Sequence, residues 1–235
     1  MLKFLRKEKV RKRIFIILAL VIIPPFLLWG VIANQKEGKK PSLLGRIEGQ
    51  NISAREYLAS YKAVQHQVAL MYGEHAKELA SSINYKAEAW DRLLLVRYAK
   101  KENIRVSDKE VVQWLLEQPL FSRKGEFDSK FYKLHTNNYL KTEPREFEEE
   151  IRQLLSIGKI QERLKSKIHL SDKELEKLYD KKRRAGKSKF TLEKERFKET
   201  TLNRKANKAM NALIEDLRKK LDLNLETMKK IFSNE

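Results

Sequence analysis

The side chains that most often carry out chemistry are few in this sequence and are not grouped. Its four histidines (His66, His75, His135 and His169) are far apart, and none has a partner at metal-ligand spacing. The chain has no cysteine and no G-x-S-x-G motif, and its eight glycines form no phosphate-binding loop. The acidic run at 148–150 fits the exposed face of a helix. We therefore expect no catalytic centre, no metal and no cofactor, and we expect that the protein is not an enzyme.

Aromatic residues form the most distinctive pattern, between Gln118 and Tyr139. Phe121, Phe127 and Phe131 surround the turn-forming pair at 124–125, and the next Asp is placed to cap a helix. The pattern predicts an aromatic corner between two helices. Packing such a corner is the simpler use of these rings, and contact with an apolar ligand is the other.

The elements that position these residues are predicted to be helical. Three S-x-x-E capping boxes, at 53–56, 107–110 and 171–174, mark helix starts. Apolar residues recur at helical spacing over 57–71, 90–98, 147–160 and 202–217, and the last helix is expected to end near Leu221 with a short one after it. Only residues 44–53 read as strand and turn. The predicted class is mainly α with a small β-hairpin at the start of the module.

Residues 14–33 contain no ionisable side chain. A helix of that length spans roughly 30 Å, which is the thickness of the hydrocarbon core of a bilayer. Seven Lys and Arg precede it and three follow closely, so we expect a cytoplasmic N-terminus and a body on the other side. A cleaved signal peptide ending at Ala33 and a buried core helix are the alternatives, although signal peptides usually have shorter apolar regions.

The net charge of +19 is concentrated near the two ends of the chain. Residues 41–162 are nearly balanced, whereas residues 163–220 hold 20 basic and 9 acidic side chains. Such a segment attracts anionic headgroups or acidic partners, and outside the cytoplasm nucleic acid is not expected. A solvated loop is the simpler interpretation of its densest part. The candidate lipid-or-partner-binding residues are Lys181, Lys182, Arg183, Arg184, Lys187 and Lys189.

An ordered set of segments resembles the N-terminal chaperone module of the SurA/PpiD family. The set is GRIEGQNIS, AWDRLLLVRYAKKENIRVSDKEV, the P-x-F…G-x-F-D…Y corner and LSDKELEKLYDKK, over roughly residues 45–184. The apolar N-terminal segment resembles the PpiD branch. The resemblance implies a periplasmic chaperone that binds unfolded, aromatic-rich segments of exported polypeptides. Many members insert a parvulin-type prolyl isomerase domain after the last of these segments, but here five residues separate Arg184 from Phe190. We therefore expect no isomerase activity.

Together these observations predict a membrane-tethered periplasmic chaperone with its body outside the inner membrane. The predicted regions are a cytoplasmic segment (1–13), a transmembrane helix (14–33), a linker (34–44), a SurA N-terminal-like helical module (45–189) and C-terminal helices that pack back on it (190–235). The expected partners are unfolded exported polypeptides and the membrane, with the translocation machinery as a further candidate. The alternative is an adaptor that docks on lipid or an envelope partner through its basic C-terminal helices. The predicted client-binding residues are Tyr57, Tyr61, Met71, Tyr72, Trp114, Phe121, Phe127 and Phe131.

Overall fold

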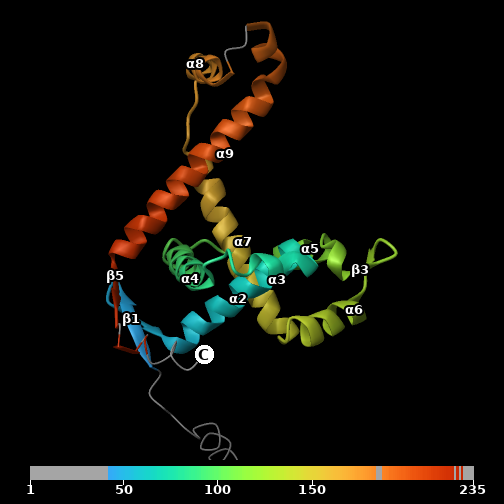
Figure 1. Ribbon diagram of the computed structural model, residues 1–235. Helices are drawn as coiled ribbons and strands as arrows, with labels where there is room; N and C mark the ends of the chain where they lie inside the picture. Colours follow the sequence, from blue (N-terminus) through green and yellow to red (C-terminus); the bar gives the residue numbers. More distant parts are fainter. Residues whose placement is uncertain (1–41, 184–186, 225, 228, 230–235) are drawn as a thin grey trace, which may run out of the picture. The chain divides into compact units, whose positions relative to one another are not determined.

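The structure is a computed structural model and describes residues 42–183, 187–224, 226–227 and 229 (Figure 1). Its class is mainly α with a small β-hairpin near the start, as the sequence predicted. No helix in this part of the chain is both long and apolar enough to cross a bilayer, and the predicted span at 14–33 lies outside the described residues. In chain order the elements are β1 (Leu43–Ile47), β2 (Gln50–Ser53), α2 (Ala54–Tyr72), η2 (Gly73–His75), α3 (Ala76–Leu79), α4 (Tyr85–Lys101), α5 (Asp108–Leu116), η3 (Pro119–Phe121), β3 (Ser122–Arg123), β4 (Glu126–Phe127), α6 (Ser129–Leu134), η4 (His135–Tyr139), α7 (Pro144–Ser166), α8 (Asp172–Arg183), α9 (Lys187–Lys219) and β5 (Leu221–Leu223).

Two of the three predicted capping boxes are complete. At the starts of α5 and α8 the serine accepts from the backbone N–H of the glutamate, and the glutamate accepts from the backbone N–H of the serine. At the start of α2 only Ser53 takes part, because the Glu56 carboxylate accepts two bonds from Arg97 of α4, at 2.7 and 2.8 Å. This glutamate therefore fastens α2 to α4 instead of closing its own cap.

β1 is the central strand of a three-stranded antiparallel sheet with the order β2–β1–β5 (Figure 1). The β1–β2 turn has positive φ at Glu48 and Gly49, as two-residue hairpins require. β5 was not predicted, and it brings the chain after α9 back to the hairpin. A Cβ on Gly45 would lie 2.3 Å from the carbonyl oxygen of Asp222, so the absence of a side chain there lets β5 approach β1.

The larger of the buried clusters joins the sheet to α2 and α4. The Tyr57 and Trp90 rings pack 4.8 Å apart between these two helices. Leu217 of α9 and Ile160 of α7 are buried in the same cluster, so residues from late in the chain complete a core begun by the hairpin. The buried members are Leu44, Ile47, Ile52, Tyr57, Val64, Val68, Ala89, Trp90, Leu93, Leu94, Leu95, Ala99, Ile160 and Leu217.

The second buried cluster is the aromatic corner. Phe121 packs edge-on against Tyr132 at 5.1 Å and against Phe147 of α7 at 5.9 Å. The turn at 124–125 closes the β3–β4 hairpin rather than joining two helices directly, and Asp128 caps α6 as predicted. The corner therefore holds α5, α6 and α7 together.

Helix α9 takes part in two separate packing regions. Near its start, Phe197 packs edge-on against Tyr179 of α8, with ring centres 5.1 Å apart. Further along, α9 lies against α7 and α4 (Figure 1). Arg218 near its end forms two bonds, at 2.6 and 2.8 Å, with the Asp91 carboxylate of α4.

Candidate functional site

Four helices surround an apolar pocket of about 360 Å³, which we call the four-helix pocket. α2, α4, α7 and α9 each contribute to it, so its walls come from segments far apart in the sequence. Besides Met71 and Tyr72, its apolar lining residues are Val64, Val68, Ile83, Leu95, Leu154, Ile157 and Ile214, and its polar lining residues are Gln67, Glu88, Asp91 and Arg92.

Two large apolar side chains stand exposed at this pocket. Met71 and Tyr72, at the end of α2, are 65% and 42% exposed. The helix stops directly after them at Gly73, which has positive φ, so both side chains lie in its last turn. A flexible thioether and an aromatic ring beside an apolar hollow can adapt to ligands of different shape.

Two charged residues that line the four-helix pocket, Arg92 and Asp91, have partners within the protein, and Asp91 pairs with Arg218 of α9. Arg92 is buried and donates to the Glu150 carbonyl at 2.8 Å and to Gln153 at 3.3 Å. Burial lowers the pKa of Arg92 to about 10, and the nearby Glu150 carboxylate opposes that shift. Glu150 also contacts His66 of α2 at 2.7 Å. These contacts fix α2, α4 and α7 around the pocket.

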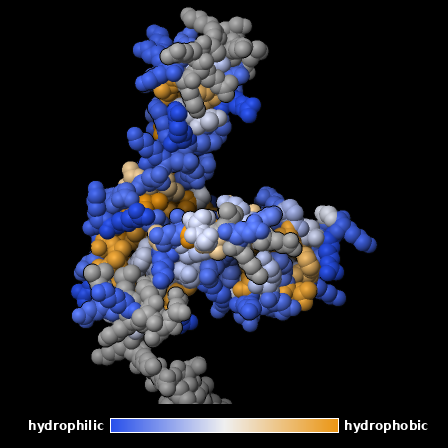
Figure 2. All heavy atoms as spheres, viewed as in Figure 1, coloured by the Kyte–Doolittle hydropathy of each residue, from blue (hydrophilic) through white to orange (hydrophobic). Residues whose placement is uncertain are grey.

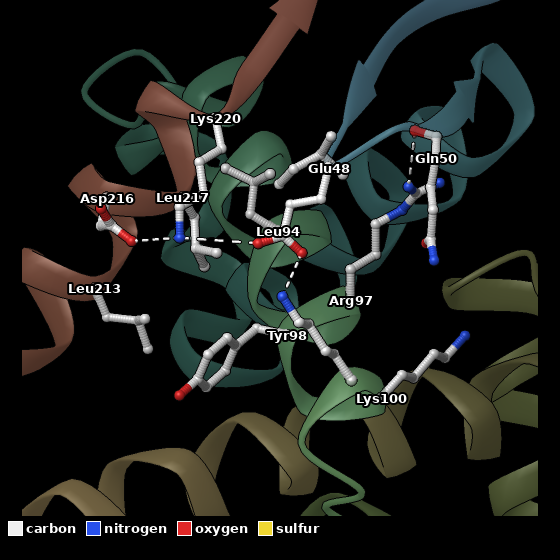
Figure 3. Close-up of a pocket in the computed structure, with 12 residues that line it drawn as sticks. Glu48, Gln50, Leu94, Arg97, Tyr98, Lys100, Leu213, Asp216, Leu217 and Lys220 are labelled. Atoms are coloured by element: carbon white, nitrogen blue, oxygen red, sulfur yellow. Dashed lines mark hydrogen bonds and ion pairs between the residues drawn. The ribbon is translucent and has the colours of Figure 1, made fainter.

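A second pocket, of about 420 Å³, lies between the β-hairpin, α4 and the end of α9 (Figure 3). Glu48 reaches Lys101 at 2.5 Å and Lys220 at 3.8 Å, and Lys220 also pairs with Asp216 at 2.7 Å. The hydrogen bond from Lys101 is the main cause of the lowered pKa of Glu48. Most lining residues of this second pocket are polar or charged, whereas most of those of the four-helix pocket are apolar, so the second pocket suits an apolar chain less well.

The space-filling view places these pockets in context. In Figure 2 hydrophobic atoms gather where the C-terminal half of α9 meets α4, with hydrophilic side chains around them. Hydrophilic side chains cover much of α9 in this view. A further hydrophobic area shows at the right of the view, in the part of the molecule that holds α5 and α6, and five of the exposed large hydrophobic residues lie between positions 112 and 139.

The eight predicted client-binding residues do not form one surface. Met71 and Tyr72 lie at the four-helix pocket, and Tyr61 is partly buried beside Tyr57 and Tyr85. Tyr57 and Phe121 are fully buried, so in this structure they support the fold and offer no surface to a ligand. Trp114, Phe127 and Phe131 are partly buried around the aromatic corner, outside the pocket. Client binding by any of the eight stays a prediction.

Several wall residues of the pocket were missed by the sequence interpretation. Leu95, Leu154, Ile157 and Ile214 are aliphatic, and a search for aromatic and methionine side chains passes over them. Leu154 and Ile157 belong to the predicted apolar stripe of α7, but a stripe does not show which of its residues meets a hollow.

The basic candidate residues are mostly outside the described side chains. Lys181 is exposed in α8, and nothing is described of the side chains of the other five. Lipid or partner binding by this segment stays a prediction. In the described part of the chain no three His, Cys, Asp or Glu side chains are grouped as a metal site would require.

Comparison with known proteins identifies the family. Residues 1–161 match the SurA-like N-terminal domain. The chain belongs to this family. It is 27% identical over 183 residues to the foldase protein PrsA of Caldanaerobacter subterraneus subsp. tengcongensis, an alignment covering 72% of this chain and 52% of PrsA. It is 26% identical over 120 residues to the periplasmic chaperone PpiD of Escherichia coli K12, covering 48% of this chain and 19% of PpiD.

The alignments with PrsA and PpiD include only part of each relative. The chain spans about half the length of PrsA and about a fifth of PpiD. No solved structure gave a significant match. Both relatives are named as folding proteins, which supports a chaperone-like role for this chain.

Proposed function

We propose that this protein is a membrane-tethered periplasmic chaperone that holds unfolded exported polypeptides and has no isomerase activity. The observation that carries the proposal is the four-helix pocket with Met71 and Tyr72 exposed beside it. Membership of the SurA-like N-terminal domain family supports it.

Holding of this kind needs burial and no reactive group. Each Å² of apolar client surface removed from water contributes about 25 cal/mol. A pocket of this size covers only a side chain or two, so binding is weak and release is fast. Weak binding suits a chaperone, because each client must be released before that client can fold.

Two sequence features support the remaining parts of the proposal. The apolar segment at 14–33 and its basic flank favour a tether, with the body in the periplasm. α8 ends at Arg183 and α9 begins at Lys187, so three residues stand where relatives of the SurA/PpiD type can hold an isomerase domain. A parvulin domain needs on the order of a hundred residues.

The test uses the full chain in nanodiscs of neutral lipid. A chemically unfolded, aromatic-rich client protein is diluted into this sample without ATP, and its aggregation is followed by light scattering. The wild type is expected to suppress aggregation. The double variant Met71→Gln with Tyr72→Ser is expected to lose most of this activity while its melting temperature stays within a few degrees of wild type, because both side chains are exposed.

The matched control is Leu134→Gln with Tyr139→Ser. These residues are 54% and 53% exposed but lie outside the pocket, so this variant should hold clients as well as wild type does. Equal loss in both double variants would show that any exposed apolar residue serves, and the pocket would lose its role. A wild type that holds no client at stoichiometric excess would overturn the proposed function.

A further inference from the structure

A third hollow, which we call the α4–α7 pocket, lies on another side of the contact between α4 and α7. It measures about 280 Å³ and shares no lining residue with the four-helix pocket. Its apolar wall is formed by Val96, Ala99, Ile104 and Val106. An apolar cavity of about 150 Å³ can hold benzene, so this one has room for a single aromatic or large aliphatic side chain.

The walls of the α4–α7 pocket are held by the backbone. After α4 the chain turns at Asn103, which has φ +54°, and the Ile104 N–H donates to the Ala99 carbonyl at 2.9 Å. This is the Schellman ending of a helix, and it brings Ile104 next to Ala99. Lys159 and Arg152 of α7 then bind the carbonyls of Arg105 and Val106, at 2.7 and 2.9 Å. The pocket is therefore preformed.

The rim of the α4–α7 pocket carries unbalanced positive charge. Arg152 pairs with Asp108 at 2.8 Å and with Glu149 at 3.1 Å. Lys100 and Arg105 also line the pocket and are exposed, and among the described residues neither side chain has an ion pair or a hydrogen bond. A ligand that brings a carboxylate to this rim would meet two uncompensated cations.

We propose that the α4–α7 pocket binds client segments in which an aromatic or large aliphatic side chain stands next to an Asp or Glu. The apolar side chain fills the pocket, and the neighbouring carboxylate lies between Lys100 and Arg105. This inference rests on the proposed function, since it names a class of client segment. The protein's own N-terminal 41 residues do not fit, because they carry ten basic and two acidic side chains.

The experiment measures fluorescence anisotropy with the full chain in nanodiscs of neutral lipid and short labelled peptides. The parent peptide is Gly-Ser-Phe-Asp-Gly-Ser, and the comparison peptides replace its Asp by Asn or Lys, or its Phe by Ser. We expect the parent to bind most tightly and the Lys peptide most weakly. Raising the salt from 50 to 500 mM should reduce the advantage of the Asp peptide over the Asn peptide, because the rim charges are exposed.

The double variant Lys100→Glu with Arg105→Glu is expected to weaken binding of the Asp peptide by about tenfold and to improve binding of the Lys peptide. Lys208→Glu is the control, since Lys208 is exposed on α9 and does not line the pocket. It should leave the order of the peptides unchanged. A second variant, Val96→Phe, places a ring in the pocket and should lower the affinity for every peptide that contains Phe. It should keep the preference for the Asp peptide over the Lys peptide. Circular dichroism checks that the variant is folded.

Two results would overturn the inference: equal binding of the Asp and Lys peptides to the wild type, or no effect of the charge reversal. Failure of the proposed function is a separate outcome. In that case the peptide preference persists while the chain suppresses no aggregation, and the α4–α7 pocket remains a peptide site without a holding role. If Met71→Gln with Tyr72→Ser abolishes holding but keeps the peptide preference, both proposals are supported.

Discussion

At the scale of single residues, Glu110 links a helix start to a neighbouring helix. Its carboxylate accepts from the Ser107 backbone N–H at 2.8 Å and hydroxyl at 2.9 Å, and it pairs with Lys159 of α7 at 2.6 Å. These bonds, with Lys159 the largest contributor, lower the pKa of Glu110 to about 2. The same carboxylate therefore caps α5 and fastens it to α7.

The lowered pKa predicts how stability changes in acid. A carboxylate whose pKa is lower in the folded state stabilises the fold above its unfolded pKa, near 4.5, and this stabilisation is lost as the pH falls towards about 2. We expect Glu110→Gln to lower the melting temperature at pH 7, and the gap from wild type should narrow between pH 5 and pH 3. Glu117→Gln, at the exposed residue that follows α5, is the control. A gap that stays constant over this range would show that the charge of Glu110 contributes nothing.

Residue type alone did not separate the core from the surface. Tyr57 and Tyr72 are both tyrosines of α2, yet Tyr57 is fully buried and Tyr72 is exposed at the four-helix pocket. Their positions in the helical repeat differ, but only the placement of α4 and α7 decides which face is covered. Phe121 likewise lies in a predicted aromatic corner, and three rings from other elements bury it.

At the scale of elements, β5 depends on the absence of a side chain at Gly45. We expect Gly45→Ala to force β5 away from β1 and to cost about 1–3 kcal/mol, since a Cβ would overlap the Asp222 carbonyl oxygen. Hydrogen exchange should accelerate at the amides of 221–223, and the melting temperature should fall. If exchange there is unchanged, the contact between these strands is less close than the structure shows.

Gly158→Ala is the matched control for Gly45→Ala. Gly158 lies within α7 with nothing within 4 Å of its added Cβ, so the change should be neutral or should stabilise the protein by about 0.4–1 kcal/mol. The two substitutions add the same atom, and their opposite expected effects isolate the contact with β5.

Most of the long helices were predictable because they carry local signals, namely a capping-box sequence at the start of α2, α5 and α8 and an apolar stripe along α2, α4, α7 and α9. β5 was not, because a three-residue strand has no pattern of its own and exists only through pairing with β1. The strands of the β3–β4 hairpin are shorter still, with two residues each, and its turn was predicted to join two helices. Whether such a short segment forms a strand depends on its pairing with another strand, and the local sequence does not show that pairing.

At the scale of the whole molecule, the end of α9 is part of the main core. We propose that residues 190–235 are needed by the body, since Leu217 is buried in the larger cluster and Ile214 lines the four-helix pocket. Deleting residues 190–235 should lower the melting temperature by many degrees or cause aggregation, measured by calorimetry and light scattering. An unchanged melting temperature in the deletion would show that α9 is independent of the body.

Leu217→Ala should lower the free energy of unfolding by about 2–5 kcal/mol. The control is Asn211→Ala at an exposed position of α9, which should change the free energy of unfolding by less than about 0.5 kcal/mol.

The pockets themselves could not be predicted from the sequence. The four-helix pocket needs α2, α4, α7 and α9 at once, and the α4–α7 pocket needs a helix ending and the side of another helix. Met71 and Tyr72 were among the predicted client-binding residues only because of their residue types, and the same choice included Tyr57 and Phe121, which are buried. The aliphatic walls and the cationic rim arise only from the packing of distant segments.

The position of β1 between β2 and β5 has a consequence for biosynthesis. A ribosome delivers the chain N-terminus first, so β1 and β2 emerge early, whereas residues 221–223 emerge only after α9. Throughout that interval one edge of β1 has no partner strand, and a bare strand edge is a template for pairing with other chains. The nascent protein thus passes through a stage in which it resembles the unfinished polypeptides that we propose it holds, and the pairing of β5 with β1 ends that stage.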